Sequence, residues 1–188
     1  MKQIAVIGLK LAVICAIAAT TLALINGVTA PRIEAYRQQR IQEALQQVSG
    51  GYSVGDAQEA DDHDRISTYH PLTDDTGALQ GYVLQVQSSG YGGPMRLIVG
   101  YRSDGSVITA RLLDNDETPG LGKDAERPEY MEKFEGTGGP QQGVPTRAGQ
   151  LPSSEADAIS GSTITFIGVA EGISRGSAFV KELGGSNE

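Results

Sequence analysis

The chain opens with a long apolar segment. From Ile4 to Ile25 there are 22 residues with a single charge, Lys10. As a helix rising about 1.5 Å per residue, this segment would extend roughly 33 Å, which is enough to cross a hydrocarbon core of about 30 Å. A cleaved signal peptide is the alternative, but its apolar region is usually only ~7–15 residues long. The length therefore predicts a transmembrane anchor over residues 1–30.

A second helical pattern follows directly. Pro31 suits the first turn of a helix, and apolar residues then recur at helical spacing as far as Gly50-Gly51. This predicts a stalk helix over residues 31–50 whose apolar stripe packs on the domain that comes after it. The stripe consists of Ile33, Tyr36, Ile41, Ala44, Leu45 and Val48.

Strand patterns dominate from about residue 66 to residue 114. Apolar and polar or smaller residues alternate around Tyr82, and two further apolar runs occupy 95–101 and 107–113. The turn sequences at 74–77 and 103–105 separate these runs, and the second is typical of a hairpin. The pattern predicts an antiparallel meander.

The remainder of the chain predicts helices. A short helix is expected over 128–134, a loop over 136–149 and a long final helix over 163–183. In the final helix Gly168, Gly172 and Gly176 recur every four residues, which gives it one bare ridge for close packing against the sheet or another helix. The predicted fold class is α+β: a transmembrane helix, then one domain over 51–188 with an antiparallel sheet and packed helices.

Charge is distributed unevenly along the chain. The formal net charge is -8, but the part up to Arg40 has a balance of +4, which leaves -12 for the rest. A strongly acidic domain repels nucleic acid and anionic lipid. We therefore expect no nucleic-acid partner.

The cysteine content limits the kinds of redox centre that the chain could hold. The only cysteine, Cys15, lies inside the apolar segment, so the chain forms no internal disulfide and has too few thiolates for an iron–sulfur cluster. The stretch from Asp56 to Arg65 is polar and acidic, and a solvated loop is expected there, because the neighbouring residues Asp61, Asp62, His63 and Asp64 cannot all converge on one metal ion. If the protein handles electrons, it uses an organic cofactor.

Three segments contain candidate chemistry, at 89–94, 116–122 and 157–165, and a turn or a helix cap explains each of them taken alone. The third is the densest in hydroxyls, with Ser160, Ser162, Thr163 and Thr165 at a predicted helix start. Free amides and the helix dipole favour a phosphate at such a place. No His or Lys near Thr165 in the sequence would deprotonate its hydroxyl, so a separate enzyme would have to activate it.

Four motifs, in order, carry a family resemblance. They are GYGGPMRLIVGY at 90–101, ETPGLG at 117–122, EYMEKFEG at 129–136 and DAISGSTIT at 157–165. With them the chain resembles the RnfG (RsxG) subunit of the Rnf ion-translocating electron-transport complex. Its flavin domain is shared with the NqrC subunit of the sodium-pumping quinone reductase. The resemblance extends from the apolar segment to the final helix.

The resemblance implies a covalent flavin. In that family an ApbE-like flavin transferase, with magnesium, takes FMN from FAD and links its phosphate to the last hydroxyl of the fourth motif, here Thr165. Ser160, Gly161 and Thr163 occupy further matching positions, while Ser162 stands where the family usually has Ala. No residue of this chain is then catalytic, because Thr165 is an attachment point.

The second motif implies contacts with the cofactor. Glu117 and Thr118 would supply polar contacts, and Leu121 and Gly122 would approach the flavin ring. Tyr91, in the first motif, is a further candidate for cofactor binding.

The implied function is that of an electron carrier with FMN, working beside other membrane subunits of an Rnf-type complex. The implied location is the bacterial inner membrane, with the soluble domain in the periplasm. Two alternatives remain open at this point: an NqrC-like subunit of a sodium-pumping quinone reductase, and a flavin-free membrane-anchored assembly module.

Overall fold

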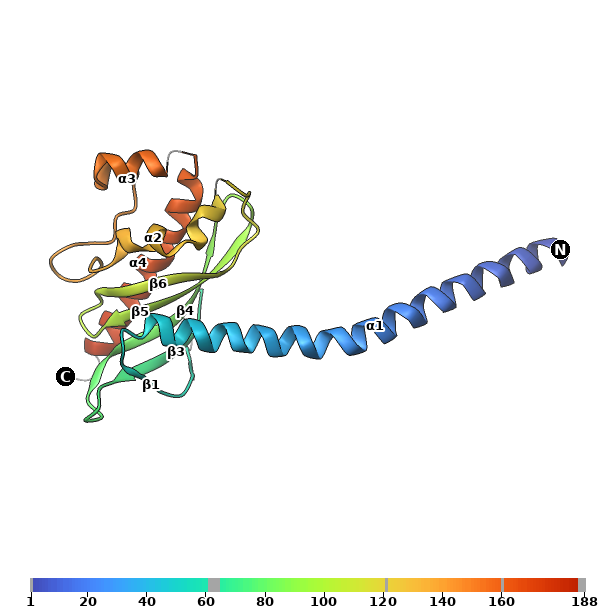
Figure 1. Ribbon diagram of the computed structural model, residues 1–188, viewed down its shortest axis with the longest axis horizontal. Helices are drawn as coiled ribbons and strands as arrows, with labels where there is room; N and C mark the ends of the chain where they lie inside the picture. The colour runs from blue at the N-terminus through green and yellow to red at the C-terminus, as the bar shows by residue number, and fades with distance from the viewer. Residues whose placement is uncertain (1, 61–64, 121, 160, 186–188) are drawn as a thin grey trace. The chain divides into compact units, whose positions relative to one another are not determined.

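The computed structural model describes residues 2–60, 65–120, 122–159 and 161–185 (Figure 1). Of the stretch from Asp56 to Arg65, expected to form a solvated loop, residues 61–64 lie outside the described part, while Gln58–Glu59 form a short strand. The chain divides into two compact units, Met1–Ile41 and Gln42–Glu188.

The first unit is formed by helix α1, Lys2–Val48, which continues into the second unit. Among the described residues it is the one helix long and apolar enough to cross a membrane. It runs through Pro31 without a break, so the prediction that a separate helix begins there was wrong. Proline fixes φ near the helical value and removes one N–H, so a helix loses a single hydrogen bond at such a position.

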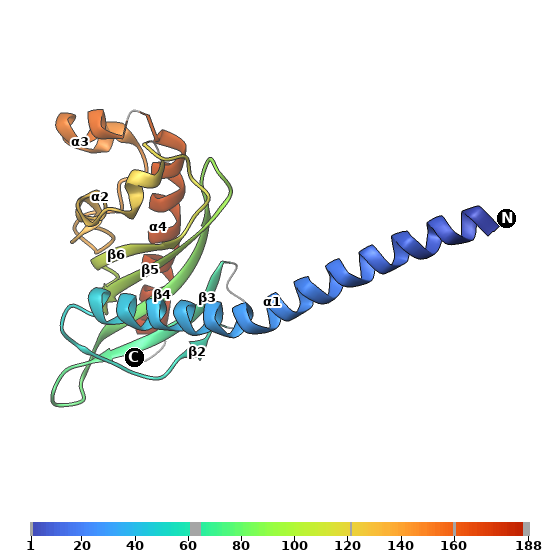
Figure 2. The same cartoon turned by 45° about the vertical axis from the view of Figure 1, so that its right-hand side comes forward.

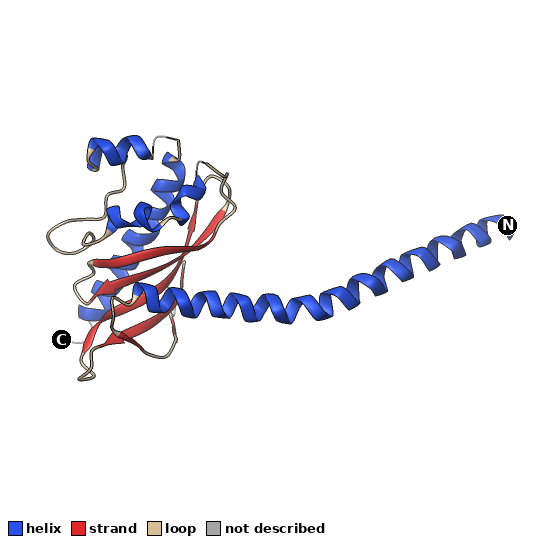
Figure 3. Cartoon of the chain, in the orientation of Figure 1, coloured by secondary structure: helices blue, strands red, loops and turns tan. Residues whose placement is uncertain are grey.

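The second unit is built on an antiparallel sheet, which confirms the predicted meander and the α+β class (Figure 3). Its spatial order is β1-β3-β4-β5-β6, and β2 also pairs with β3. The strands are β1 Ser53–Val54, β2 Gln58–Glu59, β3 Ile66–Thr73, β4 Leu79–Ser89, β5 Pro94–Arg102 and β6 Val107–Asp114. The two-residue strands β1 and β2 were not predicted, because they are too short to show an alternating pattern.

Local side-chain bonds fix the predicted turns. Between β3 and β4 the Asp74 carboxylate accepts hydrogen bonds from the Thr76 and Ala78 amides at 2.9 and 3.0 Å. Between β5 and β6 the Asp104 carboxylate accepts one from the Ser106 amide at 2.8 Å, and Gly105 has a positive φ of 83°. The register of each hairpin follows from its turn.

Helix α4, Thr163–Gly185, lies along one face of β4 and β5, and both views show this arrangement (Figures 1 and 2). The predicted bare ridge makes this contact. A Cβ at Gly168 would overlap the Ser89 carbonyl oxygen, and one at Gly176 would overlap the Tyr101 hydroxyl. That hydroxyl donates a hydrogen bond of 2.8 Å to the Ile173 carbonyl, which ties strand to helix.

The opposite face of the sheet is covered by the last turns of α1. Ala44, Leu45 and Val48 are buried in the second unit, and Gly100 of β5 has no room for a Cβ because the Val48 carbonyl lies against it. The predicted packing of the stalk is thus confirmed for these three residues. Ile33 and Tyr36 of the same stripe are more than 60% exposed.

Short helices close the second unit. They are η1 Gly122–Glu126, α2 Pro128–Met131, η2 Glu132–Phe134, η3 Ala148–Gln150 and α3 Ser153–Ala158. The predicted helix over 128–134 corresponds to α2 and η2, whereas η1, η3 and α3 were not predicted. Phe134 of η2 stacks on Phe166 of α4, with ring centroids 5.5 Å apart and planes inclined by 19°.

The glycine ridge yields a stability prediction. We expect Gly168→Ala to lower the free energy of unfolding by about 1–3 kcal/mol, because the new methyl group meets a backbone carbonyl that cannot turn aside. Chemical denaturation of the full chain in detergent, followed by circular dichroism, measures this change. Gly184→Ala is the matched control, since its Cβ would lie 3.4 Å from the nearest atom; equal effects of the two substitutions would contradict the role of the ridge.

Candidate functional site

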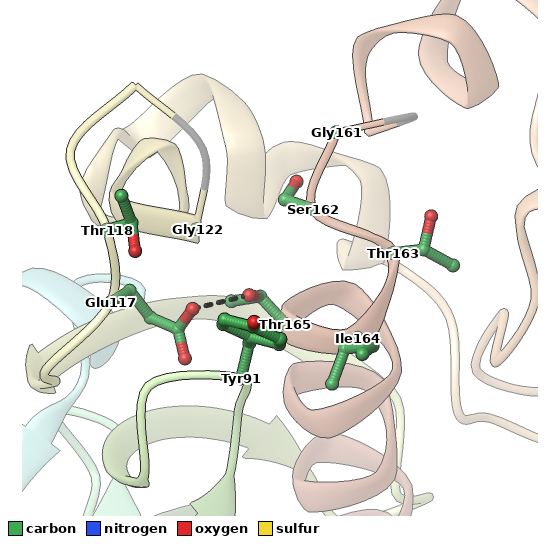
Figure 4. Close-up of a pocket in the computed structure, with 9 residues that line it drawn as sticks. All are labelled: Tyr91, Glu117, Thr118, Gly122, Gly161, Ser162, Thr163, Ile164 and Thr165. Carbon is green, nitrogen blue, oxygen red and sulfur yellow. Dashed lines mark hydrogen bonds between the residues drawn. The ribbon is translucent and has the colours of Figure 1, made fainter.

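A cavity of about 350 Å³ opens at the N-terminal end of α4 (Figure 4). Three separate segments form its walls: the β4–β5 turn, the loop after β6 and the residues that begin α4. The lining residues are Tyr91, Glu117, Thr118, Gly122, Gly161, Ser162, Thr163, Ile164 and Thr165.

Seven of the nine residues that the sequence singled out line this one cavity. They are Tyr91, Glu117, Thr118, Gly122, Gly161, Thr163 and Thr165. The other two, Leu121 and Ser160, lie outside the described residues. Residues distant in the chain thus meet where the motifs indicated a cofactor, although their individual contacts with a cofactor stay predictions.

Thr165 lies at the floor of the cavity and is paired with an acid. Its side chain is 1% exposed, and its Oγ1 donates a hydrogen bond of 2.7 Å to Oε2 of Glu117, as the dashed line in Figure 4 shows. Glu117 is itself 4% exposed. A hydrogen bond to a buried carboxylate is among the stronger ones in proteins, so this pair holds the loop after β6 to the start of α4.

Backbone groups hold Glu117 from the other side. Its Oε1 accepts a hydrogen bond of 2.9 Å from the Gly92 amide, and its own amide donates one of 3.0 Å to Oδ1 of Asn115. A Cβ at Gly90 or at Gly122 would overlap the carboxylate. The glycines of the first and second motifs therefore make room for this side chain as well as shaping turns.

The start of α4 supplies backbone donors. Among the described residues, the first hydrogen bond of the helical i to i−4 type in this helix runs from the Phe166 amide to the Ser162 carbonyl at 2.9 Å. The amides of Thr163, Ile164 and Thr165 precede that bond, and helix geometry leaves such amides without an intrahelical acceptor. Together with the helix dipole they favour an anion at the floor of the cavity.

No side-chain cation stands among the nine lining residues in the described part of the chain. Tyr130 is a buried residue that does not line the cavity, and burial raises the pKa of its phenol well above the ordinary value. The Ser162 side chain lowers this pKa, whereas the charges of Glu117 and Asp124 raise it further. Tyr130 is therefore neutral at physiological pH. An anion at the floor would depend on amides and hydroxyls for its hydrogen bonds.

The mouth of the cavity is apolar and open. Tyr91 is 76% exposed and Ile164 is 55% exposed, in contrast to the buried Thr165 below them. Figure 4 shows the Tyr91 ring in front of the Glu117–Thr165 pair, with Ile164 beside it on α4. The site thus combines a polar, enclosed floor with an apolar rim.

The pairing of Glu117 with Thr165 was missed at the sequence level. No His or Lys lies close to Thr165 in the chain, whereas Glu117 is 48 residues away and was predicted only to contact the cofactor. No local pattern links the two positions. Ile164 was also missed, because its spacing matched that of the core-facing side of the helix.

Comparison with known proteins finds similarity to flavin-binding domains and to subunits of membrane complexes. The profile of the FMN-binding domain family matches residues 90–177, a range that includes every described residue lining the cavity. The solved structure of Shewanella oneidensis NqrC is 18% identical, with a TM-score of 0.49 over 67% of this chain and 69% of that one.

The curated relatives are similar over most of their length. The G subunit of the Na(+)-translocating ferredoxin:NAD(+) oxidoreductase complex of Acetobacterium woodii is 31% identical over 92% of this chain and 89% of that protein. The G subunits of the ion-translocating oxidoreductase complexes of Methanosarcina acetivorans and Stutzerimonas stutzeri are 28% and 29% identical over 92% of this chain, covering 92% and 78% of those proteins. This chain therefore belongs to the family of G subunits of Rnf-type ion-translocating oxidoreductase complexes.

Proposed function

We propose that this chain is an electron carrier whose FMN is bonded through its phosphate to Thr165. The observation that carries the proposal is the position of this hydroxyl, buried at the floor of a cavity at a helix start and within a motif typical of flavin attachment. Bound FMN supplies an isoalloxazine ring that accepts and releases electrons.

The residues of the site have different roles. Thr165 provides the attachment oxygen at the floor, while Gly161, Thr163 and the first amides of α4 receive the phosphate. Glu117 and Gly122, which are buried beside Thr165, and the exposed Thr118 bound the space for the flavin. At the mouth, Tyr91 and Ile164 offer apolar surface for the ring, which would leave one edge accessible to a redox partner.

Attachment requires a second enzyme. With an ApbE-like transferase and FAD as donor, the Thr165 oxygen forms a bond to the flavin-side phosphorus, the bond from that phosphorus to the AMP oxygen breaks, and the hydroxyl proton is released. The leaving group is AMP. Because Thr165 is 1% exposed, the loop that carries Glu117 must move aside while this takes place.

We further propose the cellular arrangement that the family resemblance implies. Residues 1–30 anchor the chain in the bacterial inner membrane, residues 31–50 form the stalk, and residues 51–188 form the periplasmic domain. The apolar composition of the first part of α1 and the exposure of its side chains support the anchor. The partners are the other membrane subunits of the complex, which deliver and remove the electrons.

Thr165→Ala tests the attachment. Co-expressed with a flavin transferase, the parent chain should carry flavin fluorescence that migrates with the denatured polypeptide, and the variant should carry none. Loss of the hydrogen bond to Glu117 should also lower the free energy of unfolding by about 1–3 kcal/mol, with the fold retained. Denaturing gel fluorescence and circular dichroism measure the two effects.

Thr109→Ala is the matched control, since it removes a threonine hydroxyl from β6 outside the lining of the cavity and should keep the label. Expression without the transferase should give a colourless chain. A label that persists on Thr165→Ala would move the attachment to Thr163 or Ser162. A parent chain without flavin in the presence of the transferase would favour a flavin-free assembly module.

Tyr91→Ala tests whether the isoalloxazine ring of the flavin lies against Tyr91. An aromatic ring stacked on a flavin quenches its fluorescence, so removal of Tyr91 should raise the emission per covalent flavin several-fold while the flavin-to-protein ratio stays the same. Tyr91→Phe should retain the quenching. Tyr36→Ala, which removes an exposed tyrosine from α1, is the control, and an unchanged emission from Tyr91→Ala would place the ring elsewhere.

A further inference from the structure

Glu117 has both carboxylate oxygens engaged in the unmodified protein. The Gly92 amide donates to Oε1 at 2.9 Å and the Thr165 hydroxyl donates to Oε2 at 2.7 Å. The side chain is 4% exposed, so water has little access to it. Its charge is tolerated because these donors replace the water that burial removed.

Esterification of Thr165 would remove one of these donors. This step rests on the proposed function: once Oγ1 is bonded to phosphorus, it has no hydrogen to donate, and Oε2 of Glu117 faces an oxygen that can only accept. A buried carboxylate oxygen left unpaired costs more than an ordinary lost hydrogen bond. The modified site therefore needs a new donor for Oε2.

The flavin brings suitable donors to that place. Its ribityl chain joins the phosphate to the ring and carries several hydroxyls, which must lie between the floor, where Thr165 is, and the mouth, where Tyr91 is. The Glu117 carboxylate lies beside Thr165 and lines the same cavity, so a chain that leaves the phosphate must start next to it. The first hydroxyls of the chain thus fall within reach of the oxygen that Thr165 vacates.

We propose that Glu117 changes partner on modification, from the Thr165 hydroxyl to a ribityl hydroxyl of the flavin. The Gly92 amide keeps Oε1 in place, so only Oε2 exchanges its hydrogen bond. Glu117 is then a positioning residue that selects flavins with a polyol chain and sets the height of the ring above the floor. No covalent bond forms or breaks in the exchange.

Free flavins test this proposal without covalent chemistry. The full chain in detergent, produced without a transferase, is titrated with riboflavin, which has the ribityl chain, and with lumiflavin, which has the same ring and no chain. Thr165→Ala serves as the background, because it frees Oε2 as esterification would. In that background Glu117→Met should weaken riboflavin binding by about tenfold or more, with Glu117→Gln between the two.

Lumiflavin binding should be the same in all three proteins, because lumiflavin has no hydroxyl to bind. A merely structural role for Glu117 would weaken both ligands equally, and that result would overturn the proposal. Circular dichroism of each variant establishes that it is folded.

A second comparison leaves Glu117 intact. In the parent chain the Thr165 hydroxyl competes for Oε2, so the preference for riboflavin over lumiflavin should be larger in Thr165→Ala than in the parent. Thr109→Ala, which removes a threonine hydroxyl from β6 outside the lining of the cavity, should keep the parent's preference. Equal preferences in all three proteins would also overturn the proposal.

The outcomes separate this inference from the proposed function. The parent chain could acquire covalent flavin on co-expression while the preference for riboflavin over lumiflavin is the same in all variants. In that case Glu117 has no ribityl contact and the carrier function stands. If the parent chain neither binds lumiflavin nor acquires covalent flavin, the proposed function fails and this inference fails with it.

Discussion

The close contact of α4 with the sheet is the constraint on which the site depends. Gly168 and Gly176 let the helix backbone approach β4 and β5, and a Cβ at either position would overlap a strand atom. This close contact fixes the position of the helix on the sheet, and with it the position of Thr165 in its first turn. Thr165 is itself buried and bonded to Glu117, so the close packing around it restricts its movement.

A buried carboxylate within the proposed flavin site requires an explanation, because a carboxylate beside a phosphate repels it. Here the Gly92 amide donates to Glu117, while the phosphate would be received by the first amides of α4. The two negative groups would thus have separate sets of donors. The glycines at 90 and 122 are required for this separation, since a side chain at either position would fill the space of the carboxylate.

The elements that could be predicted from the sequence are those with a periodic residue pattern or with a characteristic turn sequence. Three such features are the meander, the turns at Asp74 and Asp104, and the glycine ridge of α4. Each depends on residues within one segment or one face, so its pattern can be recognised in the sequence. The passage of α1 through Pro31 was not predicted, because proline is equally suited to beginning a helix. Glu117 and Thr165 meet only through the tertiary fold, and no spacing rule connects them.

The contrast between the floor and the mouth of the cavity suits an electron carrier. Covalent attachment at Thr165, as proposed, would keep the cofactor from being lost, while the exposed Tyr91 and Ile164 would leave the ring near the surface. A fixed phosphate and an accessible ring would allow successive redox partners to reach the same flavin, and for this the polyol chain between them would have to be held in a defined position.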